Sequence, residues 1–120
     1  MDILIVDDSK TMRIILQRAI RQAGYRTLTV AEAENGVQAL SAIANEQPRL
    51  ILSDWNMPEM SGIDFLRQVR AAQNPVPFGF VTSESSVEMK NLAFQTGASF
   101  LLTKPFTAED IQEVLSPVLG

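Results

Sequence analysis

The chain has 120 residues, 46% of them apolar, which is the size of one domain with a hydrophobic core. It contains no cysteine and no histidine, which excludes disulfides, thiolate and imidazole metal ligands, and catalysis by histidine. Acids outnumber bases 14 to 10, the opposite of the balance typical of nucleic-acid binders. No apolar run approaches the ~20 residues that span a membrane, and the start has no basic leader. We therefore expect a soluble cytoplasmic domain that binds neither nucleic acid nor membrane directly.

Short apolar runs alternate with longer amphipathic segments along the whole chain. The spacing predicts strands over 3–6, 27–31, 50–54, 78–82 and 100–103, and helices over 9–23, 35–47, 62–72, 85–97 and 107–116. A capping box is expected at 85–88, residues 107–110 are expected to cap the last helix, and Pro117 is expected to end or kink that helix. Alternating strands and helices predict an α/β fold, with a parallel sheet covered by helices on both faces.

Polar residues follow four of the predicted strands. Asp7 and Asp8 end the first strand, Asp54 ends the third, Thr82 ends the fourth, and Lys104 follows the fifth. In a parallel α/β sheet the carboxyl ends of the strands form one edge, where binding sites lie. Each residue alone also fits an ordinary role, such as a helix cap or a surface lysine. Together they place three mutually repelling carboxylates in one crevice, an arrangement that stability alone does not favour.

An all-oxygen site of this kind suits Mg²⁺, which would relieve the repulsion. Such a site supports attack by a carboxylate on phosphorus, which forms an acyl phosphate. The metal and the lysine would neutralise the transferring group, and the hydroxyl would bond one of its oxygens. One aspartate is then the nucleophile and the others hold the metal.

Taken together, the motifs resemble those of response-regulator receiver domains, and most closely those of single-domain chemotaxis regulators. The residues that carry the resemblance are 7–8, 33–40, 54–62, 82, 97–98 and 104–106. The resemblance covers nearly the whole chain and implies one receiver domain over 1–120. It also implies a flavodoxin-like fold with strand order 2-1-3-4-5.

The resemblance assigns a role to each acidic residue. Asp54 would accept a phosphoryl group from a phosphohistidine on a histidine kinase or histidine phosphotransfer domain, so the chain itself needs no histidine. Mg²⁺ would be held by Asp8 directly, by Asp7 directly or through water, by Asp54, and by the backbone carbonyl of Asn56. The output protein is not indicated by the sequence.

The resemblance also implies how the signal would leave the site. Lys104 would pair with the phosphoryl group, Thr82 would respond to it, and the bond from Lys104 to Pro105 would be cis. An aromatic residue usually lies three positions before this lysine and rotates inward, but here that position is Leu101. Strand alternation points the neighbouring Phe100 to the other face. Leu101 or the 83–86 loop would then carry the switch.

Two loop residues are expected to set the lifetime of the phosphorylated form. Asn56 lies two residues after Asp54, and Glu84 lies two after Thr82. Both can flank an acyl phosphate and bond an attacking water. The pair is similar to that of chemotaxis regulators and favours rapid self-dephosphorylation.

The first helix is expected to carry a basic docking face for the phosphodonor. It has Ile14 as the apolar contact, among Lys10, Arg13, Arg18 and Arg21. The fourth helix, fifth strand and last helix would face output partners, with Phe94 in the core.

Three alternatives use parts of the same pattern. A haloacid-dehalogenase-type phosphohydrolase also uses Asp, Mg²⁺, Thr and Lys, but its nucleophile ends the first strand in an Asp-x-Asp pattern. An FMN-binding flavodoxin needs a phosphate loop where this chain has Asp7 and Asp8. A pseudo-receiver would be an interaction module that is never phosphorylated, and such a module does not need the acids and the lysine.

Overall fold

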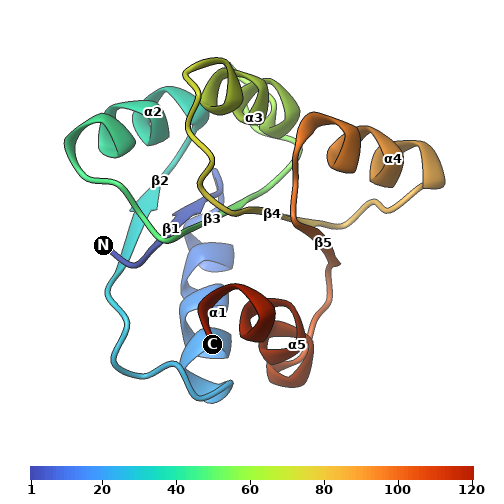
Figure 1. The fold of residues 1–120 in the computed structure, drawn as a ribbon. Coiled ribbons are helices and arrows are strands. Elements are labelled where there is room, and N and C mark those ends of the chain that lie inside the picture. Colours follow the sequence, from blue (N-terminus) through green and yellow to red (C-terminus); the bar gives the residue numbers. More distant parts are fainter.

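The computed structural model describes residues 1–120, which form one parallel five-stranded sheet between two layers of helices (Figure 1). The strands are β1 (Ile3–Val6), β2 (Val30–Ala33), β3 (Leu50–Ser53), β4 (Phe78–Thr82) and β5 (Phe100–Thr103). Their order in the sheet is β2-β1-β3-β4-β5, which confirms the predicted topology.

Five helices cover the sheet. They are α1 (Lys10–Gln22), α2 (Gly36–Asn45), α3 (Gly62–Ala71), α4 (Val87–Thr96) and α5 (Ala108–Leu119). Helices α2, α3 and α4 lie on one face, and α1 and α5 lie on the other (Figure 1). None of these helices is both long and apolar enough to cross a membrane.

The alternation of side chains along the strands divides the core into two clusters. In β1, Leu4 and Val6 belong to the cluster beneath α2, α3 and α4, whereas Ile3 and Ile5 belong to the cluster beneath α1 and α5. All four β1 side chains are fully buried. Burial on both faces is why these strands read as continuous apolar runs rather than as alternating ones.

Strand β2 begins at Val30, later than the predicted 27–31 segment. The backbone N–H and the hydroxyl of the preceding Thr29 both donate to the Asp2 carboxylate, at 2.8 and 3.0 Å. This N–H is therefore not available for pairing with a neighbouring strand. Strand β2 is at the edge of the sheet and pairs only with β1. Where such a strand begins depends on these tertiary contacts, which residue propensities alone do not predict.

Two predicted helix ends were wrong. The cap of α4 is Ser86, whose hydroxyl accepts from the Met89 N–H, rather than a box starting at Ser85. Pro117 lies inside α5, which continues to Leu119. Val118 and Leu119 pack against the core cluster beneath α1 and α5, and this burial compensates for the hydrogen bond that proline cannot donate. The predicted cap at the start of α5 is confirmed, and Thr107 and Asp110 form a capping box there.

Strands β4 and β5 fit together through a glycine and an aromatic ring. Gly79 and Phe100 are direct partners in the register of the two strands. A Cβ at Gly79 would lie 2.1 Å from Cε1 of Phe100, so the ring covers the space above the glycine. Phe100 packs toward α1 and α5, and Leu101 packs toward the opposite cluster, as alternation predicted.

Candidate functional site

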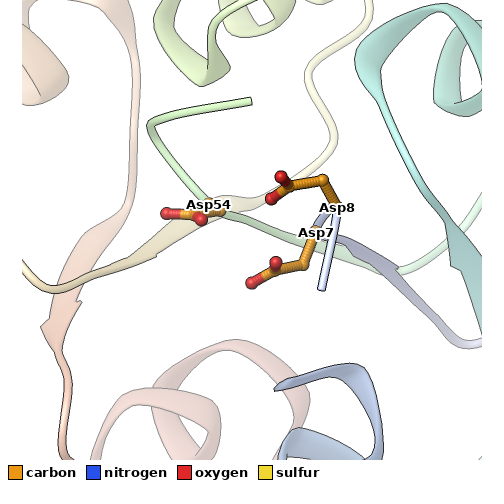
Figure 2. A group of neighbouring side chains, drawn as sticks. All are labelled: Asp7, Asp8 and Asp54. Carbon is orange, nitrogen blue, oxygen red and sulfur yellow. The ribbon is translucent and has the colours of Figure 1, made fainter. Parts of the chain in front are cut away.

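Three carboxylates meet at the carboxyl edge of the sheet. Asp7 and Asp8 follow β1 and Asp54 follows β3, and the backbone N–H of Asp54 donates to the Val6 carbonyl at 2.9 Å. One carboxylate oxygen from each residue lies within 4.8 Å of the others. Figure 2 shows the three side chains close together, Asp7 and Asp8 from the end of one strand and Asp54 from the end of its neighbour, with their carboxylates extending toward the same side. The predicted convergence of the three aspartates is therefore present.

The Asp7 carboxylate is 2% exposed and is held from two sides. Its Oδ1 accepts from the Ser9 N–H at 2.9 Å, and its Oδ2 lies 3.3 Å from Nζ of Lys104. Burial raises the pKa of Asp7 above its ordinary value, and the nearby charge of Asp54 adds to this rise. The Ser9 hydrogen bond and Lys104 oppose the shift in pKa without cancelling it.

The ammonium group of Lys104 lies close to two acids of the cluster, Asp7 and Asp54. Its Nζ lies 3.5 Å from Oδ2 of Asp54 as well as close to Asp7. The other Asp54 oxygen accepts from the Trp55 N–H at 2.7 Å. The backbone N–H of Lys104 donates to the Thr82 carbonyl at 2.8 Å, and the bond to Pro105 is cis.

Thr82 is fully buried at the end of β4, and its hydroxyl accepts from the Glu84 N–H at 3.3 Å. The side chains of Glu84 and Asn56 are exposed, so both loop residues are open to water. Leu101 is half-buried against the core cluster beneath α2, α3 and α4.

The structure changes the interpretation of two predicted residues. Arg13 is 7% exposed, so it does not belong to an exposed basic face, whereas Ile14 is 40% exposed as predicted. Phe94, predicted in the core, is 51% exposed. Helix α4 buries only Ala93, whereas α3, of the same length, buries five residues. The sequence pattern does not report how much of a helix its neighbours in the fold will cover.

The donor set fits a hard divalent cation. All side-chain groups are carboxylate oxygens, and one ammonium faces three carboxylates, which leaves negative charge in excess. Mg²⁺ prefers oxygen ligands and is commonly bound by one or two carboxylates, with water completing its coordination. Asp8 is exposed and can meet a hydrated ion, whereas Asp7 is already engaged by Ser9 and Lys104.

Comparison with known proteins places this site in a class. The sequence profile of the response regulator receiver domain matches residues 3–116, so the chain belongs to that family and is a two-component response regulator. It is similar to chemotaxis protein CheY1 of Helicobacter pylori, with 38% identity over all of this chain and 98% of the relative. The CheY homolog of Campylobacter jejuni is 37% identical over all of this chain and 93% of its own length.

Solved structures support the same assignment. CheY4 of Vibrio cholerae superposes with a TM-score of 0.85 at 35% identity, covering 98% of this chain and 97% of the other. The receiver domain of NtrX from Brucella abortus gives 0.88 at 25% identity, covering 98% of each chain. Because the chain belongs to this family, the flavodoxin and phosphohydrolase interpretations no longer apply. Receiver domains bind Mg²⁺ through an acidic pocket and interact with a histidine kinase or phosphotransfer partner, and the aspartate cluster here is of that kind.

Proposed function

We propose that residues 1–120 act as one receiver whose phosphoacceptor is Asp54. The observation that carries this proposal is the placement of Asp54 beside two further carboxylates, with Nζ of Lys104 at 3.5 Å from its Oδ2. Asp7 and Asp8, together with Asp54 and the backbone carbonyl of Asn56, would hold Mg²⁺. When bound, the ion neutralises charge on the phosphoryl oxygens.

The donor is a phosphohistidine on a histidine kinase or a histidine phosphotransfer domain. An Asp54 carboxylate oxygen attacks phosphorus, the new O–P bond forms, and the N–P bond breaks with its electron pair returning to the imidazole. The chain has no histidine, so the imidazole belongs to the partner. Hydrolysis then returns Asp54 to its carboxylate and releases inorganic phosphate.

Lys104 and Thr82 would act on the phosphoryl group after transfer. The new group brings about −1.5 to −2 charges to the end of β3, which favours a shift of the Lys104 ammonium from the carboxylates to the phosphoryl oxygens. The Thr82 hydroxyl accepts from the Glu84 N–H and still has its own proton to donate to a phosphoryl oxygen. Rotation of the hydroxyl toward that oxygen would draw the loop after β4 with it, with Leu101 in place of an aromatic switch.

Two surfaces and two loop residues complete the proposal. Asn56 and Glu84 flank the acceptor from exposed loops and would set the rate of hydrolysis. Ile14, with Lys10, Arg18 and Arg21, all exposed on α1, would contact the phosphodonor. The output protein would bind a face that phosphorylation changes.

The test is intact-mass spectrometry after incubation with Mg²⁺ and acetyl phosphate. We expect one phosphoryl group on the unaltered protein, none on Asp54→Asn, and none with EDTA. Asp64→Asn is the matched control, because Asp64 is exposed on α3 and pairs only with Arg67. Labelling of Asp54→Asn at the level of the unaltered protein would disprove Asp54 as the acceptor.

A pseudo-receiver predicts a different pattern. No adduct, with Mg²⁺ still changing Trp55 fluorescence, leaves either a pseudo-receiver or very fast hydrolysis. Beryllofluoride separates them, since a competent acceptor forms a stable complex and a pseudo-receiver does not.

A further inference from the structure

One arginine on α1 is buried and points to the backbone of the acidic cluster. Nη1 of Arg13 donates to the carbonyl oxygen of Asp7 at 2.6 Å, and Nε donates to Oε1 of Glu32 at 2.8 Å. The arginine side chain is 9% exposed. Neither hydrogen bond uses a carboxylate of the cluster, so Arg13 leaves those oxygens available to a cation.

The carbonyl that Arg13 binds belongs to the peptide joining Asp7 to Asp8. The Asp7 N–H donates to the Ala33 carbonyl at 3.1 Å, which fixes the peptide before Asp7. The Asp8 side chain is exposed, so core packing does not orient it. The guanidinium therefore fixes the plane of the one peptide that determines where Asp8 points relative to Asp7.

Stability alone gives a weak reason for a charged group at this place. The desolvation of a buried guanidinium costs free energy. The ion pair with Glu32 offsets little of this cost, because Glu32 is 39% exposed and water screens the pair. An apolar side chain would fill the space without the cost of desolvating a charge, but the buried Asp7 carbonyl would lose its donor. The fork geometry of arginine, however, binds a carbonyl and a carboxylate at once, and lysine does not reproduce it.

We infer that Arg13 is a positioning residue for the cation site, and that Glu32 on β2 holds Arg13 in place. This inference rests on the proposed function, in which Asp7 and Asp8 hold Mg²⁺. Groups that orient metal ligands from behind commonly change metal affinity by about 10- to 100-fold when they are removed. Glu32 lies in an open polar hollow with Lys10, Glu34 and Gln38, where water can replace its carboxylate, so its removal should have the smaller effect.

The experiment measures Mg²⁺ affinity by Trp55 fluorescence in Arg13→Met, Arg13→Lys and Glu32→Gln. The matched control is Arg18→Met, which removes an exposed cation from the same helix. We expect Arg13→Met to weaken binding about tenfold or more, with Glu32→Gln and Arg13→Lys in between and Arg18→Met within about twofold. Urea unfolding of each variant identifies the conditions in which it is folded.

A metal-free readout separates positioning from general destabilisation. Hydrogen exchange at the Ser9 amide, which donates to Oδ1 of Asp7 across the same turn, is measured by NMR without Mg²⁺. It should quicken in Arg13→Met relative to amides of β3, and not in Arg18→Met. Affinity within about twofold of the unaltered protein in folded Arg13→Met, with unchanged exchange at Ser9, would overturn the inference. Where Arg13→Met does not fold, the same two results in Arg13→Lys and Glu32→Gln would overturn it.

Failure of the proposed function looks different. It would appear as no Mg²⁺ binding by the unaltered protein, or as equal binding by Asp8→Asn. The inferred role toward the cation would then be wrong as well, and the exchange of the Ser9 amide would still show whether Arg13 fixes the turn.

Discussion

Strand β1 and the two residues after it show two opposite uses of the same backbone. Ile3–Val6 are apolar, fully buried, and bonded to strands on both sides. Asp7 and Asp8 follow at once, and there the chain gathers negative charge around a single lysine. The interior supplies the stability that makes the charged edge tolerable. A substitution at the charged edge can therefore raise the free energy of unfolding, whereas a substitution in the interior is expected to lower it.

The largest change in the free energy of unfolding is expected for a substitution in the interior. Phe80→Ala should lower the free energy of unfolding by about 3–5 kcal/mol, because it empties a fully buried ring site. Urea unfolding measures this loss. Phe94→Ala is the control, since its ring is 51% exposed and its removal should change stability by only about 0.5 kcal/mol. Equal losses in the two variants would contradict the comparison.

At the charged edge a substitution should raise the free energy of unfolding rather than lower it. Asp7→Asn should raise the free energy of unfolding by roughly 1–3 kcal/mol at pH 7 without Mg²⁺, because it removes one buried charge from a repelling group. The raised pKa of Asp7 means that folding favours its protonated form. Its contribution to stability therefore falls as pH rises from the ordinary value of 3.8 through the raised value.

Urea unfolding of both proteins at pH 4 and pH 7 checks this prediction. The gain from Asp7→Asn should be smaller at pH 4, where the native carboxyl is more protonated. Added Mg²⁺ should narrow the difference at pH 7 by stabilising the unaltered protein. A gain that is larger at pH 4 than at pH 7 would show that charge repulsion is not its cause.

A change in the loops should affect lifetime without affecting stability. Glu84→Lys should lengthen the phosphorylated lifetime roughly fivefold, or about 1 kcal/mol in the barrier, because it removes a carboxylate that can bond the attacking water. Decay of the phosphorylated protein after removal of the donor measures this. Glu88→Lys, a similar exposed change in the first turn of α4, should leave the decay rate unchanged. An unchanged rate in Glu84→Lys would exclude the role.

The smallest effect is expected on α1. Ile14→Asp should slow transfer from a phosphohistidine protein about twofold, since a single peripheral contact contributes little to an interface. Labelling by acetyl phosphate, which needs no docking, should stay at the level of the unaltered protein. Phe94→Asp on α4 is the control for an exposed apolar side chain. Loss of both activities in Ile14→Asp would indicate misfolding rather than docking.

The same contrast explains what could be predicted from the sequence. Strands β1, β3 and β4 are buried on both faces, so their apolar runs reveal them, and the polar residues that follow reveal the edge. The interpretation of Arg13 failed because a cation on an amphipathic helix normally lies in water. Its burial depends on Glu32 and on the Asp7 carbonyl, two partners that only the assembled sheet brings within reach.

The fit between Gly79 and Phe100 has a consequence for how this sequence can vary. Because the ring occupies the space of a missing Cβ, the two positions share one volume. A larger residue at 79 is compatible with the sheet only when residue 100 becomes small. Either step taken first gives a clash or a void, each of which costs stability. Descendants of this chain should therefore exchange the large and small residues of β4 and β5 as a pair.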